Sequence, residues 1–255
     1  MRLPDRIGVR TWGGMSGEMT QVGRILWLDI ARSLAVLGMV IYHFTFDLGM
    51  FGFIAPYVPV TGFWAVFARA VAGSFLLLAG FSLVLSHGSG IVWPAFWRRF
   101  ALVAGAALLI TVATWFAMPA QFIFFGILHS IALSSLLGLA FLRLPWGVTL
   151  AVAVVVLILP QVYRDVAFDT PMLAWVGLAP SFPPTMDYEP LFPWFGAFLL
   201  GVVLARVMLA QGPLVRVAPS PILARLTWPG RHSLVIYLVH QPIMIGLFDL
   251  YFWLR

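Results

Sequence analysis

The chain alternates long apolar stretches with short polar connections. About 20 apolar residues cross a bilayer as a helix, and seven stretches are close enough to that length to be read as spans. They lie at roughly 25–46, 60–86, 95–117, 122–141, 146–162, 191–211 and 231–252. Pro145, Pro190 and Pro229 stand at the start of three of them, where a helix tolerates proline. The pattern predicts an all-α fold, a polytopic membrane helix bundle.

The polar start of the chain sets the domain organisation. Residues 1–23 show neither the apolar region nor the cleavage site of a signal peptide. We expect them to form a disordered cytoplasmic tail. The remaining length suits one domain, so residues 24–255 are predicted to form a single transmembrane unit.

Composition narrows the class further. Apolar residues make up 62% of the 255 residues and charged residues 9%, against about 25% charged in soluble domains. The net charge of +6 comes without basic runs, which argues against a nucleic-acid partner. The chain has no cysteine, and all fifteen basic residues are arginine. Thiolate nucleophiles, disulfides and catalytic lysines are therefore excluded.

Arginine is concentrated on alternate connections. The tail and the even-numbered connections hold Arg2, Arg6, Arg10, Arg24, Arg98, Arg99, Arg143, Arg206, Arg216, Arg225 and Arg231, whereas the other connections and the C-terminus hold Arg164 and Arg255. Because cytoplasmic loops of membrane proteins are rich in arginine and lysine, the N-terminus is predicted to be cytoplasmic and the C-terminus outside.

The longest outer connection, about 163–190, is rich in acidic residues. It carries Asp165, Asp169, Asp187 and Glu189 among many prolines and aromatic residues. Long loops often have a function, so this one either covers an outward-facing pocket that takes a polar acceptor or is a solvated connector.

One stripe of ionisable residues runs along the first span. At about 100° per residue, Arg32 and His43 lie about 20° apart around the helix, and Asp29 and Asp47 both lie about 60° from Arg32. Charge facing lipid is costly, so the stripe is predicted to face a protein interior. Asp29 and Arg32 are spaced for an ion pair, and Asp47 is spaced to orient His43 as a base or nucleophile. The alternative is a hydrogen bond between packed helices.

Other spans offer residues to complete a site. Arg69 lies inside the second span, where it either holds a phosphate or carboxylate or pairs with a buried acid. His129 in the fourth span and His240 in the seventh each either have a functional role or only form a single hydrogen bond between helices. His87 and His232 lie at the predicted cytoplasmic surface of the membrane and are expected to have no role in the site. The membrane histidines lie at different depths, so no metal site is predicted.

Four segments together resemble the heparan-alpha-glucosaminide N-acetyltransferase catalytic-domain family, in a short prokaryotic form. They are "RILWLDIARSLAVLGMVIYHFTFDL", "FLLLAGFSLVLS", "FGILHSIALSSLL" and "PWFGAFLLGVVLA". The resemblance covers most of the chain and implies acyl transfer from cytosolic acetyl-CoA or another acyl-CoA to a sugar or other envelope acceptor outside. It also implies a multi-pass protein of the bacterial cytoplasmic membrane. Larger members of the family have more helices, so formation of a homo-oligomer by this shorter chain is left as an open alternative.

The residues and the resemblance converge on one mechanism. His43 is expected to activate the acceptor or carry the acyl group, with Asp47 orienting it and His129 as a second acid/base group or an oxyanion donor. Arginines suit the phosphates of the acyl-CoA, and those assigned to it are Arg24, Arg32, Arg69, Arg98 and Arg99. The acceptor or channel side is assigned Trp194, Tyr237 and His240.

A transporter or flippase that uses the same groups as a proton relay is the rival. Transporters usually show internal repeats with paired broken helices, and the chain shows only one helix interrupted by proline, at Pro242.

Overall fold

Helices make up the regular structure in the part of the chain that the computed structural model describes, residues 23–255. The predicted tail therefore lies, apart from Gly23, outside the described residues. The α-helices are α1 (Leu26–Met50), α2 (Gly62–His87), α3 (Trp93–Ala117), α4 (Ile127–Gly138), α5 (Trp146–Val162), α6 (Leu191–Gln211), α7 (Pro221–Leu226), α8 (Trp228–Arg231) and α9 (Ser233–Trp253). Short 3-10 turns are η1 (Val58–Val60), η2 (Pro119–Gln121), η3 (Leu139–Leu142), η4 (Val166–Phe168) and η5 (Ala174–Val176).

The helices match the predicted membrane bundle in kind. Five of those described, α1, α2, α3, α6 and α9, are long and apolar enough to cross a membrane, and two shorter apolar segments cover Ile127–Leu142 and Trp146–Val162. The chain is thus an all-helical, multi-pass membrane protein. The predicted spans 146–162 and 191–211 have the bounds of α5 and α6. The fourth span starts later than predicted, at Ile127, because residues 122–126 run in extended form before α4.

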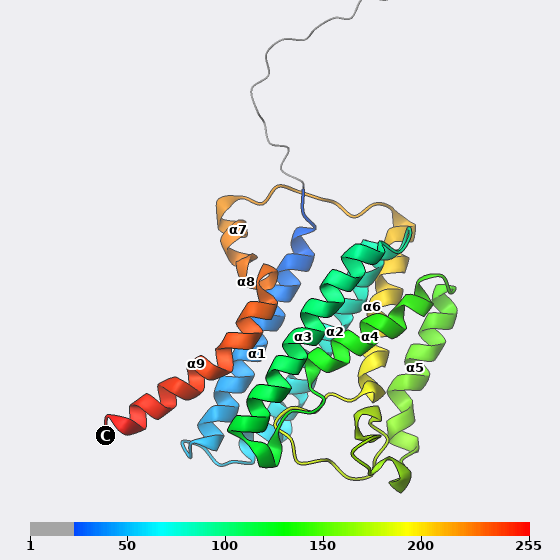
Figure 1. The fold of residues 1–255 in the computed structure, drawn as a ribbon. Helices are drawn as coiled ribbons and strands as arrows, with labels where there is room; N and C mark the ends of the chain where they lie inside the picture. Colours follow the sequence, from blue (N-terminus) through cyan, green and yellow to red (C-terminus); the bar gives the residue numbers. More distant parts are fainter. Residues whose placement is uncertain (1–22) are drawn as a thin grey trace, which may run out of the picture.

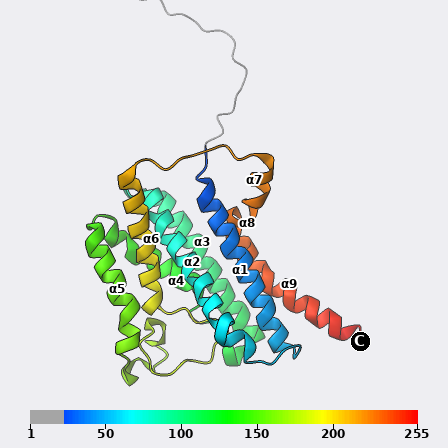
Figure 2. The same cartoon turned by 180° about the vertical axis from the view of Figure 1, so that it is seen from behind.

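Consecutive long helices run in alternating directions (Figure 1). The described chain starts at the end of the bundle where α2 turns into α3 and where α6 ends. The segment between α5 and α6 and the C-terminus lie at the opposite end, and the view from behind agrees (Figure 2). α9 packs on α1 and leans away from the other helices toward its C-terminal end.

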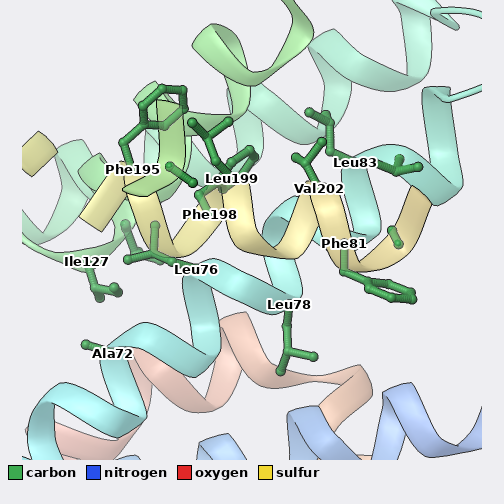
Figure 3. Close-up of a cluster of buried hydrophobic side chains, with 14 of the residues drawn as sticks. Ala72, Leu76, Leu78, Phe81, Leu83, Ile127, Phe195, Phe198, Leu199 and Val202 are labelled. Atoms are coloured by element: carbon green, nitrogen blue, oxygen red, sulfur yellow. The ribbon is translucent and has the colours of Figure 1, made fainter. Parts of the chain in front are cut away.

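Helix α6 forms the centre of the packing, between α2 and α5. Leu76 and Phe81 of α2 and Phe198, Leu199 and Val202 of α6 have no exposed surface (Figure 3). Such close contact between two helices needs small residues where their backbones meet.

Two glycines supply that close approach. A Cβ on Gly201 would meet the carbonyl oxygen of Leu77 and lie 2.9 Å from the amide nitrogen of Phe81. A Cβ on Gly80 would in turn meet the carbonyl oxygen of Phe198. Each glycine therefore accommodates the other helix's backbone, and together they fix how α2 and α6 cross.

Candidate active site

A cavity of about 180 Å³ lies among α1, α2, α4, α9 and the segment that returns to α6. Its walls carry an imidazole, two carboxylates and three tyrosines among apolar side chains. The lining residues are Met39, Tyr42, His43, Ala68, Val71, Ala72, Phe75, Ile127, Met186, Asp187, Tyr188, Glu189 and Tyr237. A mostly apolar cavity with a few convergent polar groups is the usual form of a small-molecule site.

The acidic wall is held in place through the backbone. The Met186 amide donates to the Gln121 carbonyl at 3.0 Å, and the Glu189 amide donates to the Phe125 carbonyl at 3.1 Å. These bonds bind residues 186–189 to the stretch that leads into α4. The end of the acidic connection thereby becomes one wall of the cavity.

Asp187 is anchored by two donors at one oxygen. Its Oδ2 accepts from the Ile127 amide at 3.0 Å and from the Tyr237 hydroxyl at 3.3 Å. Ile127 is the first residue of α4, where amides lack partners within the helix and the helix dipole favours an anion. Burial raises the pKa of Asp187, and the two donors only partly oppose it. Asp187 therefore joins α4, α9 and the cavity wall.

Glu189 has a buried oxygen that is not engaged. Within residues 23–255, its Oε2 has no hydrogen-bond partner. Burial and the nearby charge of Asp187 raise the pKa of Glu189 well above its ordinary value, against the opposing influence of the Trp194 indole and the Arg69 guanidinium. Each acid thus has one oxygen without a partner among the described residues, but only Asp187 is held by donors from both α4 and α9 through its other oxygen.

His43 lies beside His240, whose ring centroid is 4.8 Å away. The Nδ1 atom of His240 lies 2.7 Å from the carbonyl oxygen of Tyr237, so we assign the proton to Nδ1. Its Nε2 is then an acceptor, and among the described residues it has no partner. The ring of His240 is in this way oriented by its own helix and left basic on the other side.

Asp47 is paired with α9 rather than with His43. Its Oδ1 accepts from Gln241 Nε2 at 3.2 Å, and its Oδ2 has no partner within the described chain. The structure therefore does not contain the predicted Asp47–His43 hydrogen bond. Asp47 Oδ2, Gln241 Oε1 and His240 Nε2 are all buried without a partner among the described residues.

His129 is engaged at both ring nitrogens. Its Nδ1 accepts from the Gly126 amide at 3.2 Å, and its Nε2 lies 3.1 Å from the Thr111 hydroxyl, which itself donates to the Ile123 carbonyl. His129 is also absent from the residues that line the cavity. The structure thus places it as a cap for α4 and a tie to α3.

Arginines gather at the other end of α1. Arg32 Nη1 lies 3.2 Å from Asp29 Oδ1, which is the pairing that their spacing predicts, and Arg24 Nε lies 3.8 Å from Asp29 Oδ2. Arg32 Nη2 also donates to Ser82 Oγ at 2.6 Å. Arg99 lines a narrow space of about 20 Å³ with Ser82. Four arginines predicted to hold the acyl-CoA, Arg24, Arg32, Arg98 and Arg99, thus lie on the part of the bundle nearest the start of the described chain.

The structure separates Arg69 from these arginines and brings the other predicted residues toward the cavity. Arg69 lies two turns into α2 from the opposite end of the bundle, near Glu189. Tyr237 lines the cavity, and Trp194 packs between Glu189 and Gly73. No group of three or more possible metal ligands is found in residues 23–255.

Periodicity along single helices does not find the residues that complete the site. Asp187 and Glu189 lie in a connection, and Gln241 lies next to His240 on a helix far along the chain. The sequence signal that could have identified the two acids is their position just before Pro190 and α6. Two acidic residues directly before a membrane helix need a partner or a ligand.

Residues 24–242 match the sequence profile of a family described as "Heparan-alpha-glucosaminide N-acetyltransferase, catalytic". No curated protein and no solved structure matches the chain.

Proposed function

Because that match spans most of the chain, the chain belongs to the heparan-alpha-glucosaminide N-acetyltransferase catalytic family, and we propose that it is a membrane-embedded acyltransferase. It moves an acyl group, in the first instance acetyl, from acyl-CoA to a sugar or other acceptor. The observation that carries this proposal is the cavity that holds His43 together with Asp187, Glu189 and Tyr237. A transferase needs a base and groups that orient the acceptor in one enclosed space.

The donor is proposed to enter from the end of the bundle that carries the arginines. Acyl-CoA is a polyanion, and guanidinium groups bind phosphates in bidentate fashion. Eleven residues separate Arg32 from His43 on α1, which is about 16 Å along a helix. A long, thin acyl-carrying arm suits that distance, with its phosphates at Arg24, Arg32, Arg98 and Arg99 and its thioester near His43.

His43 is proposed to take the proton of the acceptor as the acceptor attacks the thioester carbonyl. The new bond joins the acceptor oxygen or nitrogen to the acyl carbon, the C–S bond breaks, and the thiolate leaves and takes up a proton. The His240 ring lies 4.8 Å from the His43 ring, and its Nε2 has no partner among the described residues. His240 is therefore proposed, in place of Asp47, as the neighbour that shares this proton. An acyl-histidine intermediate at His43 uses the same geometry.

The two ends of the bundle are proposed to face opposite sides of the membrane. With the arginines in the cytoplasm, the donor binds inside, the acceptor enters beneath the segment 163–190 outside, and all seven apolar segments cross. The site of action is then the cytoplasmic membrane of a bacterium. Among the described helices α9 packs mainly on α1, with smaller contacts to α3 and α8, which leaves room for a second copy of the chain beside it.

The test is release of CoA thiol by the purified protein in detergent. The chain has no cysteine, so a thiol reagent reports only the product. Acetyl-CoA with a panel of sugars is expected to release thiol only when an acceptor is present. No release with any acceptor, together with proton-coupled uptake in vesicles, would instead establish the transporter.

A further inference from the structure

A second, larger cavity of about 410 Å³ lies at the end of the bundle opposite the arginines. We call it the apolar groove. Its walls come from the end of α1, the connection through η1, the end of α3 with η2, and the segment before α6. The lining residues are Phe46, Gly49, Met50, Pro56, Pro59, Met118, Pro119, Ala120, Gln121 and Met186. Among them only Gln121 has a polar side chain and none is charged, so the groove suits an apolar ligand.

The apolar groove and the cavity around His43 share a wall. Met186 lines both, and its amide donates to the carbonyl of Gln121, which lines the groove, at 3.0 Å. On α1, Phe46 and Met50 follow His43 by three and seven residues. They therefore lie about 60° and 20° from it around the helix, and about 4.5 and 10.5 Å further along the axis. The two spaces follow each other along one face of α1.

Methionine side chains come from three of the segments that form the groove. Met50 belongs to α1, Met118 follows α3, and Met186 lies before α6. Methionine is flexible and adapts to apolar ligands of irregular shape. No guanidinium lines the groove to hold a phosphate, and one side-chain amide is too little to bind a sugar. The groove therefore fits a hydrocarbon chain.

The mouth of the groove opens where aromatic side chains are exposed. Met50 and Pro56 at its edge are exposed, and so are Tyr57, next to Pro56, and Trp115, one turn before the end of α3. Tyrosine and tryptophan are enriched at the interface between membrane and water. A chain that occupies the groove is thus able to enter it sideways from the bilayer.

Resting on the proposed function, we propose that the acceptor is a membrane lipid whose hydrocarbon chain lies in the apolar groove and whose headgroup reaches His43 in the adjoining cavity. The groove then holds the headgroup in place against the thioester. The headgroup oxygen or nitrogen forms the new bond to the acyl carbon, and His43 takes its proton. The C–S bond breaks, and the CoA thiolate leaves and takes up a proton. The acylated lipid returns to the bilayer through the mouth of the groove.

The acyl chain of a long acyl-CoA is the other hydrocarbon that the groove could hold. Such a chain would arrive from the arginine end through the cavity around His43, and it needs no opening to the bilayer. The groove has that opening, at Met50 and Pro56, as a ligand that enters from the membrane requires.

The first experiment does not depend on activity. The full chain is placed in phosphatidylcholine vesicles that contain a trace of phosphatidylcholine with a diazirine in its acyl chain, and light-induced cross-links are mapped by mass spectrometry. Cross-links should be several-fold more frequent at Met118 and Ala120 than at Leu102 and Leu109, which are exposed on α3 outside the groove. Octyl β-D-glucoside should reduce them, and methyl β-D-glucoside should not. An even distribution along α3 would overturn the inference.

The second experiment measures thiol release from acetyl-CoA with octyl and methyl β-D-glucoside, which share a headgroup and differ in chain length. Ala120→Trp fills the groove and should lower the ratio of kcat/KM for octyl over methyl glucoside by about tenfold or more, as for lost burial of about two methylenes. Ala113→Trp, the same change at an exposed alanine of α3 outside the groove, should keep the wild-type ratio. Partitioning of the glucosides into the vesicles is common to all three proteins and cancels.

An equal loss with both glucosides in Ala120→Trp, or a wild type that uses both equally well, would overturn the inference. So would a wild type that prefers octanoyl-CoA to acetyl-CoA and loses this preference in Ala120→Trp, because the groove would then hold the chain of the donor. The cross-links of the wild type decide whether lipid binds even if Ala120→Trp does not fold. No thiol release with any acceptor would remove the proposed function and the acceptor role with it, whereas the cross-links would still test the groove as a lipid site.

Discussion

Replacing Gly201 with alanine should destabilise the bundle at its centre. The added Cβ would meet the Leu77 carbonyl oxygen, and its distance to the carbonyl carbon would be 2.8 Å, whereas ordinary contacts begin at 3.4 Å. A helical backbone cannot rotate out of the way as a side chain can. Relief therefore requires α2 and α6 to separate by a distance on the order of 1 Å, which loosens contacts along both helices.

The size of the effect follows from that clash. Overpacking typically costs about 1–3 kcal/mol, and a clash with backbone belongs at the upper end. For a chain of this length, each kcal/mol shifts the melting temperature by about 2–4 °C, so a loss of about 3 kcal/mol predicts a decrease of about 6–12 °C. Because α2 also lines the cavity, transfer activity should fall at temperatures where the protein is still folded.

The assay is thermal unfolding of the purified protein in detergent, with Gly105→Ala as the matched control. A Cβ on Gly105 of α3 would meet nothing within 4 Å. Alanine in a helix is favoured over glycine by up to about 1 kcal/mol, so this control should keep or slightly raise the melting temperature. A Gly201→Ala protein that melts within about 2 °C of the wild type would contradict the packing of α2 on α6.

Three further predictions concern charge and topology. The pKa values of Asp187 and Glu189 are raised in the folded state, so the folded protein holds protons that the unfolded chain releases. The contribution of these protons to folding stability is complete below about pH 4. It is lost as pH rises through the raised pKa values of the two acids. Melting temperature should therefore fall less steeply with pH in Glu189→Gln than in the wild type, and identical slopes would contradict the burial of Glu189. Replacing Arg98 and Arg99 with glutamine should weaken acetyl-CoA binding by about tenfold or more at low salt and by less at high salt. Arg255→Gln, at the other end of the bundle, should leave binding unchanged. If the variant without Arg98 and Arg99 binds acetyl-CoA as tightly as the wild type at both salt concentrations, these two arginines are not part of the donor site. Tags at Gly90 and Asp169 should be accessible from opposite sides of the membrane, and labelling from one side would contradict both seven crossings and transfer across the bilayer.

Local patterns in the sequence predict the helices well. The apolar stretches at 146–162 and 191–211 have the bounds of α5 and α6, because proline precedes each helix, polar residues follow α5, and Gly212 and Pro213 follow α6. The start of α4 could not be read in this way. Residues 122–126 are as apolar as a helix, but their backbone pairs with residues 186–189, a contact between distant parts of the chain.

The residues of the site likewise fall into two groups: those that local spacing predicts, and those that depend on contacts between distant parts of the chain. The Asp29–Arg32 ion pair follows from a spacing of three residues on one helix. The neighbours of His43 and Asp47, which are His240 and Gln241, are nearly two hundred residues away and are set by how α9 packs on α1. Periodicity identifies which face of α1 is polar but not what meets it. A free carboxylate such as Glu189 is recognised only once the fold shows which acids are already paired.

The central claim is that His43 takes the proton of the acceptor inside the cavity, and thiol release by His43→Ala tests it most directly. The variant should bind acetyl-CoA and melt like the wild type, yet its turnover with an acceptor should fall by at least about 10²–10⁴-fold, as expected when a base is lost. His232→Ala, at an exposed histidine near the donor end, should keep full activity. Near-normal turnover in well-folded His43→Ala protein would contradict the account.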